Sequence, residues 1–166
     1  MSPHPGSIGR GPGVYGALTR SEQRTWDATR AHFTRAYVDW AEQAGFSEYG
    51  FDTRYRGKLD DVDVIIENGV RVSGWYGAEV RLALSTGDPP GTLRPLARTP
   101  GLVSTPLRER IAELMTRAPE LGATRIEDDA IVLLLAAQVA PERVEELARD
   151  VIAACLPRVD AMGPYR

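Results

Sequence analysis

Apolar and polar residues alternate along most of the chain between Phe51 and Leu84. A period of two is typical of antiparallel strands that bury one face. Asn68-Gly69 lies inside this run, and both residue types tolerate the positive φ angles of a two-residue hairpin turn. Tyr76-Gly77 is either a second tight turn or the middle of one long strand. The pattern therefore predicts three or four strands, roughly over residues 50–58, 62–67, 70–76 and 78–85.

One face of this predicted sheet is apolar and would pack against helices, through Val62, Val64, Val70, Val72, Val80 and Leu82. The other face is mainly charged and combines both signs: Arg54, Arg56, Lys58, Arg71 and Arg81 with Asp52, Asp63, Glu67 and Glu79. Sheets that bind RNA combine basic residues with exposed stacking aromatics. Because acidic residues share the face here, we interpret the charges as cross-strand ion pairs and expect no nucleic-acid partner.

Aromatic residues at helical spacing predict a helix before the sheet. Thr19 and Glu22 fit a capping box at its start, and Gly45 fits its end. The apolar stripe between them consists of Trp26, Phe33, Tyr37, Trp40 and Ala44. Such a stripe needs a surface to cover, and the predicted sheet supplies one.

The second half of the chain predicts two helices and a hairpin. Thr105-Pro106 fits an N-cap and first helical residue. Strands over 124–127 and 130–136 follow, joined at Asp128-Asp129, and Pro141 opens a last helix. The apolar stripe of that helix is the clearest in the chain: Val144, Leu147, Ala148, Val151, Ile152, Cys155 and Leu156. Residues 86–105 are rich in proline and form a lid, a binding loop or a missed element, such as a short helix near Leu93–Arg98.

These elements predict an α+β fold: an antiparallel sheet of five to six strands with helices on one face. The length of 166 residues suits one domain, which we place at residues 19–158. Residues 1–18 are rich in glycine and proline and are expected to form a flexible tail, and residues 159–166 a frayed end.

Composition narrows the class of protein. A net charge of −3 gives no electrostatic reason to expect nucleic acid. We find no apolar run long enough for a membrane span and no signal peptide, and a single cysteine cannot form an internal disulfide. Lys58 is the only lysine among 20 basic residues, which we attribute to GC-rich codons. The composition favours a cytoplasmic, bacterial protein.

No motif demands a particular chemistry. Residues 11–16 match G-x-G-x-x-G, but no strand precedes them and Pro12 removes an amide donor. Cys155 falls on an apolar stripe, where a thiol is inert packing, and His32 lacks a nucleophile partner. The acidic clusters Asp60, Asp61, Asp63 and Glu127, Asp128, Asp129 coincide with predicted turns. We therefore predict no catalytic residue, no metal site and no cofactor.

Two sets of residues remain as candidate binding sites. Ile65, Trp75 and Ala83, with Arg71, fall on the sheet face opposite the valines, where an exposed tryptophan would indicate a protein contact. The alternative for this face is that a helix or residues 86–105 cover it. Trp26, Tyr37, Trp40 and His32 could instead line a small-ligand pocket, or an enzyme site with a carboxylate, between the first helix and the sheet.

The order helix, three strands, helix, two strands, helix resembles the class I type III secretion chaperones and the related YbjN-type domains. The hairpin run Tyr55–Leu84, the apolar strand Ala130–Ala136 and the closing helix Glu142–Leu156 carry this resemblance, which covers roughly residues 20–157. Such domains are non-enzymatic homodimers that bind partner segments or act as adaptors. The resemblance thus implies a protein-binding, adaptor or chaperone-like module that binds a protein partner or itself.

Overall fold

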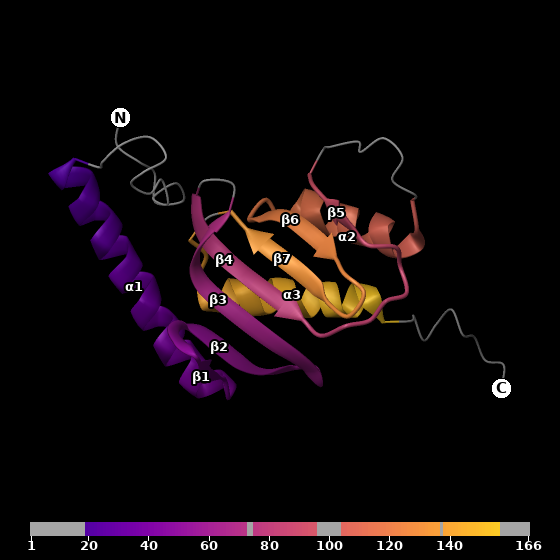
Figure 1. Cartoon of the computed structure of the whole chain (residues 1–166), viewed down its shortest axis with the longest axis horizontal. Coiled ribbons are helices and arrows are strands. Elements are labelled where there is room, and N and C mark those ends of the chain that lie inside the picture. Colours follow the sequence, from indigo (N-terminus) through magenta and orange to yellow (C-terminus); the bar gives the residue numbers. More distant parts are fainter. Residues whose placement is uncertain (1–18, 73–74, 96–103, 137, 157–166) are drawn as a thin grey trace.

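The computed structural model describes residues 19–72, 75–95, 104–136 and 138–156. The helices in these ranges are α1 (Arg20–Ala44), α2 (Pro106–Arg117) and α3 (Pro141–Cys155) (Figure 1). The strands are β1 (Ser47–Tyr49), β2 (Phe51–Leu59), β3 (Val62–Val72), β4 (Trp75–Leu82), β5 (Gly91–Leu93), β6 (Leu121–Ile126) and β7 (Ile131–Leu135). The predicted tail, residues 1–18, and the predicted frayed end, residues 159–166, lie outside the described residues.

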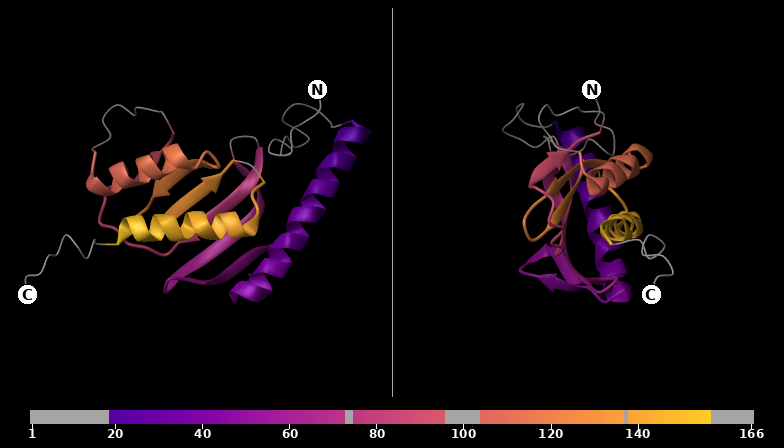
Figure 2. Two further views of the ribbon diagram at one scale, coloured as in Figure 1. Left: turned by 180° about the vertical axis from the view of Figure 1, so that it is seen from behind. Right: turned by 90° about the vertical axis from the view of Figure 1, so that its right-hand side faces the viewer.

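All of these strands form one antiparallel sheet in the order β1-β2-β3-β4-β7-β6-β5. The three helices lie on one side of the sheet, as the right-hand view of Figure 2 shows. The predicted α+β fold with an antiparallel sheet is therefore confirmed. The sheet has seven strands and not five to six. The two edge strands, β1 and β5, have three residues each, which is too short for an alternating pattern to be recognised.

The predicted hairpin at Asn68-Gly69 is wrong. β3 passes through both residues, and its register against β4 shifts between Asn68 and Val70, as in a β-bulge. Gly69 has a φ of +83°, so the preference for positive φ is real but serves a bulge. The turn between β2 and β3 is Asp60-Asp61, with φ angles of 49° and 66° as in a type I′ turn.

The bulge changes the alternation in the second half of β3. Val70 pairs with Gly77 and Val72 pairs with Trp75, out of phase with the first half of the strand. The expectation that Val70 and Val72 continue the helix-packed face assumed a hairpin, and this register does not support it. Tyr76-Gly77 is not a turn, because β4 continues through it.

The helix ends follow the signals in the sequence. Gly45 has a φ of +76°, and the backbone N–H of Phe46 donates a 2.8 Å hydrogen bond to the carbonyl of Ala41, which ends α1. Thr105 caps α2 through its side-chain oxygen, which accepts a 3.2 Å bond from the N–H of Arg108. Pro106 and Pro141 occupy the first positions of α2 and α3 as predicted.

The core lies between the helices and the inner face of the sheet. The stripe of α3 is confirmed over five residues, which are at most 1 % exposed: Val144, Leu147, Ala148, Val151 and Ile152. Cys155 is half-buried, and Leu156 follows the end of the helix and is 50 % exposed. The stripe therefore ends one turn earlier than the sequence pattern indicates.

Residues 86–105 contain the missed strand β5 and a segment held against α2. The side-chain hydroxyl of Thr105 bonds to the carboxylate of Asp88, and the guanidinium of Arg108 donates to the carbonyl of Pro89. Arg108 is only 3 % exposed, so this contact is part of the core. The helix predicted near Leu93–Arg98 overlaps β5 at its first residue, and residues 96–103 lie outside the described residues.

Candidate functional site

A groove runs between α2 and α3, and contacts at both ends fix the two helices relative to each other. At one end, Nε of Arg110 on α2 donates a 2.8 Å hydrogen bond to the carbonyl of Ala154 on α3. At the other end, Nε of Arg143 on α3 donates a 2.7 Å bond to the carboxylate of Glu120, just beyond α2. The start of α2 therefore lies beside the end of α3, so the two helices are antiparallel.

This α2–α3 groove has a volume of about 500 Å³. Its floor includes Leu114, Ala118 and Leu147, which the inward stripes of the two helices supply and which are at most 6 % exposed. Ala153 and Ala154 line one end with short side chains. The combination leaves a groove that is open to solvent, with little apolar surface exposed on its floor.

The walls of the groove carry three basic and three acidic side chains: Arg110, Arg117, Arg143, Glu113, Glu146 and Asp150. Arg143 is satisfied by Glu120 and by Glu146, the second pair at 3.0 Å. Within the described part of the chain, Glu113, Arg117 and Asp150 form neither an ion pair nor a side-chain hydrogen bond. These three charges are available to a bound molecule.

The Glu120–Arg143 contact makes this end of the groove sensitive to acid. The hydrogen bond from Arg143 lowers the pKa of Glu120 below its usual 4.5 and raises the pKa of Arg143. A lowered carboxyl pKa means that the pair stabilises the fold fully above the usual pKa and is lost as the pH falls through the lowered one.

Glu120→Gln should therefore lower the free energy of unfolding at pH 7 by less than about 1 kcal/mol, because the pair is partly exposed. The difference from wild type should shrink as the pH falls below 4.5. Urea denaturation of both proteins across the pH range measures it. A difference that grows toward low pH would contradict this account of the pair.

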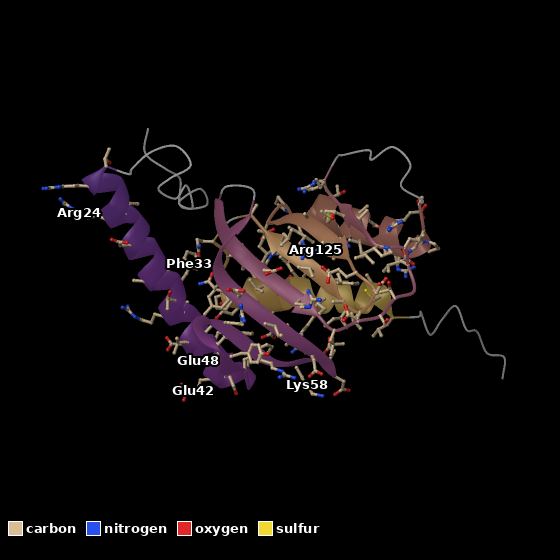
Figure 3. All side chains as sticks on the ribbon, viewed as in Figure 1. Arg24, Phe33, Glu42, Glu48, Lys58 and Arg125 are labelled. Atoms are coloured by element: carbon tan, nitrogen blue, oxygen red, sulfur yellow. The ribbon has the colours of Figure 1, made fainter. Side chains whose placement is uncertain are left out.

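The face of the sheet away from the helices carries ion pairs, and the expected cross-strand pairing is confirmed for Arg54–Glu67 and for Lys58–Asp63. Arg54 on β2 pairs with Glu67 directly opposite on β3, at 3.2 Å. Glu127 joins Arg81 and Arg125 at 2.8 Å and 2.7 Å. The hydrogen bond from Arg125, followed by that from Arg81, lowers the pKa of Glu127. Arg125 lies on this face in Figure 3.

Two of the four predicted partner-binding residues are described on or near this face. Ile65 is half-buried and lines a hollow of about 180 Å³, whose rim includes the exposed ring of Tyr49. Ala83 is exposed, and its N–H donates to the carbonyl of Asp63 just beyond β4. Arg71 and Trp75 belong to β3 and β4, but their side chains lie outside the described part of the chain.

The residues of the alternative ligand pocket are not brought together around either hollow. Tyr37 is fully buried, and its hydroxyl donates a 2.9 Å bond to the carbonyl of Val139; burial raises its pKa. Nε1 of Trp40 donates a 2.8 Å bond to Glu145. His32 is exposed and lies edge-on to Phe33. The side chain of Trp26 lies outside the described residues.

The other side chains that could react or bind a metal take part in packing, turns or ion pairs. Burial raises the pKa of the Cys155 thiol to about 11, so the thiol is protonated at neutral pH. Asp60 and Asp61 form the type I′ turn, and Asp60 pairs with Arg149. No three potential metal ligands lie together among the described residues. In the same part of the chain, no helix is long and apolar enough to span a membrane.

The groove is the feature that sequence reasoning missed. Glu113 and Arg117 on α2, and Glu146 and Asp150 on α3, each follow an i, i+4 spacing that places the two charges on one side of their helix. That spacing was visible in the sequence. The adjacency of α2 and α3 was not, because it follows from the order of the strands beneath them. Comparisons of the chain with protein-family models, with curated proteins and with solved structures find no match.

Proposed function

We propose that this chain is a non-catalytic protein-binding module that holds a polypeptide segment in the α2–α3 groove. The observation that supports the proposal is the groove itself: an apolar floor between charged walls on two helices fixed at both ends. Its volume of about 500 Å³ lies in the range of binding sites in proteins. A groove between two helices that lie side by side suits an extended or helical segment.

The charges along the groove define the segment it would accept. Glu113 and Asp150 each lie about one helical turn from the Arg110–Ala154 contact, so they flank the same stretch of the groove. A basic side chain of the segment would lie between these two carboxylates. Arg117, one turn further along α2, would meet an acidic one, while small apolar side chains of the segment would lie over Leu114 and beside Ala153.

The wider expectations from the sequence belong to the same proposal. The partner is a protein, and the module acts as an adaptor or chaperone, as the resemblance to secretion chaperones implies. We place it in the cytoplasm of a bacterium, which the single cysteine and the arginine-rich composition support. The net charge of −3 argues against nucleic acid as the partner.

Site-specific photocrosslinking in the native cells tests the groove. A photoreactive amino acid at Ala153, which is exposed and lines the groove, should form an adduct with one defined polypeptide. The matched control position is Ala112, an exposed alanine of α2 that does not line the groove. A synthetic peptide of the crosslinked segment should then bind the purified chain, and Ala153→Trp should weaken its binding at least tenfold while Ala112→Trp does not.

Equal adducts at both positions would show that the groove is not the binding surface. Crosslinking only to metabolites or lipids would replace the protein partner by a small ligand. A peptide that binds the wild type and Ala153→Trp with equal affinity would also contradict the proposal.

A further inference from the structure

The first half of α1 projects beyond the edge of the sheet (Figures 1 and 2). All side chains described between residues 20 and 32 are exposed, and among the described side chains of α1 burial begins with Phe33 and Tyr37. An isolated helical segment of about 12 residues is marginal in water. A contact outside this chain would stabilise it.

One exposed stripe of α1, which we call the seam, combines three charged with three apolar side chains along the line by which two helices can meet. Its positions follow each other at alternating steps of four and three residues: Arg24, Ala28, Ala31, Arg35, Val38 and Glu42. All six are exposed, and Val38 is one of the large apolar side chains at the surface, at 43 % exposure. Figure 3 shows Arg24 pointing away from the molecule and Phe33 pointing toward the sheet, so the seam faces outward.

The seam is complementary to itself when two copies run antiparallel. In the register that matches seam positions in pairs, Arg24 lies opposite Glu42 of the second copy, and Glu42 lies opposite Arg24 of the second copy. Val38 then lies opposite Ala28, a large side chain against a small one, and Arg35 lies opposite Ala31. A parallel arrangement would instead place Arg24 against Arg24 and Glu42 against Glu42, which is repulsive.

The charged side chains of this seam have no partner among the described residues. In the part that the structure describes, Arg24, Arg35 and Glu42 take part in no hydrogen bond or ion pair. The buried stripe of Phe33, Tyr37, Trp40 and Ala41 lies on the opposite side of the helix, so a partner on the seam does not compete with the core.

We infer that the outer face of α1 is a homodimer interface, in which two copies of the chain pair through antiparallel α1 helices. The dimer is symmetric, and each copy uses the same residues. The two domains lie on opposite sides of the helix pair and at opposite ends of it, so both α2–α3 grooves remain open.

Charge reversal on the seam tests this pairing with the full chain. Sedimentation should show a concentration-dependent monomer–dimer equilibrium for the wild type. Arg24→Glu or Glu42→Arg alone places like charges at both ends of the helix pair and should weaken dimerisation by about tenfold or more. The double variant Arg24→Glu, Glu42→Arg should restore it. Circular dichroism checks that each variant keeps the helices of the wild type.

Mixing the two single variants tests the charge pairing most directly. Arg24→Glu leaves an acidic side chain at both ends of the seam, and Glu42→Arg leaves a basic side chain at both ends. The mixed dimer therefore pairs opposite charges at each end, so the mixture should dimerise more tightly than either variant does alone. Arg94→Glu, an exposed charge reversal just beyond β5 and outside the groove, is the matched control and should leave dimerisation unchanged.

Two outcomes of these measurements overturn the inference. The first is a wild-type chain that is monomeric over the accessible concentrations. The second is a dimer that ignores both charge reversals, since another surface must then form it.

Cysteine crosslinking fixes the orientation. In a Cys155→Ser background, Ala28→Cys with Val38→Cys should give a disulfide-linked dimer under mild oxidation. Within one helix the two positions are about 15 Å apart, too far for an internal bond. Crosslinking of the single variant Ala28→Cys in preference to the pair would indicate a parallel arrangement and contradict the antiparallel one. These outcomes are independent of peptide binding in the α2–α3 groove.

Discussion

Leu147→Ala should lower the free energy of unfolding by roughly 2–5 kcal/mol. Leu147 is 1 % exposed on the inward stripe of α3, and α3 contacts β2, β4 and α2 as well as α1. Shortening the side chain removes its burial and leaves a cavity, because packed neighbours move only partly into the space. Urea denaturation should show a lower midpoint with an unchanged slope.

The matched control for this prediction is Leu156→Ala. It makes the same chemical change one residue beyond the end of α3, where the side chain is 50 % exposed. Its expected effect is within about 0.5 kcal/mol. Ile152→Ala, at a second buried position of α3, should behave like Leu147→Ala. If all three variants unfolded at the same urea concentration, α3 would not be the core helix that the structure shows.

The elements that could be predicted are those whose apolar pattern extends over several periods. The α3 stripe repeats over three turns, and the Ile131–Leu135 strand is apolar throughout, so burial alone distinguishes them from loops. β1 and β5 escaped prediction because three residues show no period. Their positions at the two edges are set by backbone pairing with β2 and β6.

Asn68-Gly69 shows how a local signal can be correct while its consequence is wrong. Glycine favours the positive φ found at Gly69, and the structure uses that conformation. A type I′ hairpin turn and a β-bulge both need a residue with positive φ, and strand residues with alternating apolar side chains flank both. Only the pairing of the whole of β3 with β4 distinguishes the two, and that is a long-range property.

Candidate sites were harder to predict than the fold for a related reason. Tyr37 and Trp40 are polar at one end, and the sequence does not show whether that end meets a ligand or the protein. In the structure both ends are satisfied by residues more than 100 positions away, Val139 and Glu145. The α2–α3 groove likewise depends on which helices are neighbours. Its charged residues look like ordinary solvated faces when each helix is considered alone.

The contact between Gly57 and Phe46 was also invisible in the sequence, and it supports the second large prediction. A Cβ atom at Gly57 would lie 2.6 Å from Cγ and Cδ1 of Phe46, closer than any non-bonded carbon contact allows. Phe46 is 6 % exposed and packs against Trp40 with ring centroids 4.7 Å apart. The ring covers the glycine on β2, so glycine is required here by close approach and not by its backbone angles.

Gly57→Val should therefore lower the free energy of unfolding by about 3 kcal/mol or more, because the valine displaces the Phe46 ring and its packing on Trp40 is lost. Lys58→Val, the next residue of β2, is the control: its side chain is 66 % exposed, so the effect should stay within about 0.5 kcal/mol. The double variant Phe46→Ala, Gly57→Val should lose less stability than the sum of the single variants, since removing the ring makes room for the valine. Additive losses would mean that the Phe46 ring does not lie over Gly57, and that other residues pack α1 against β2.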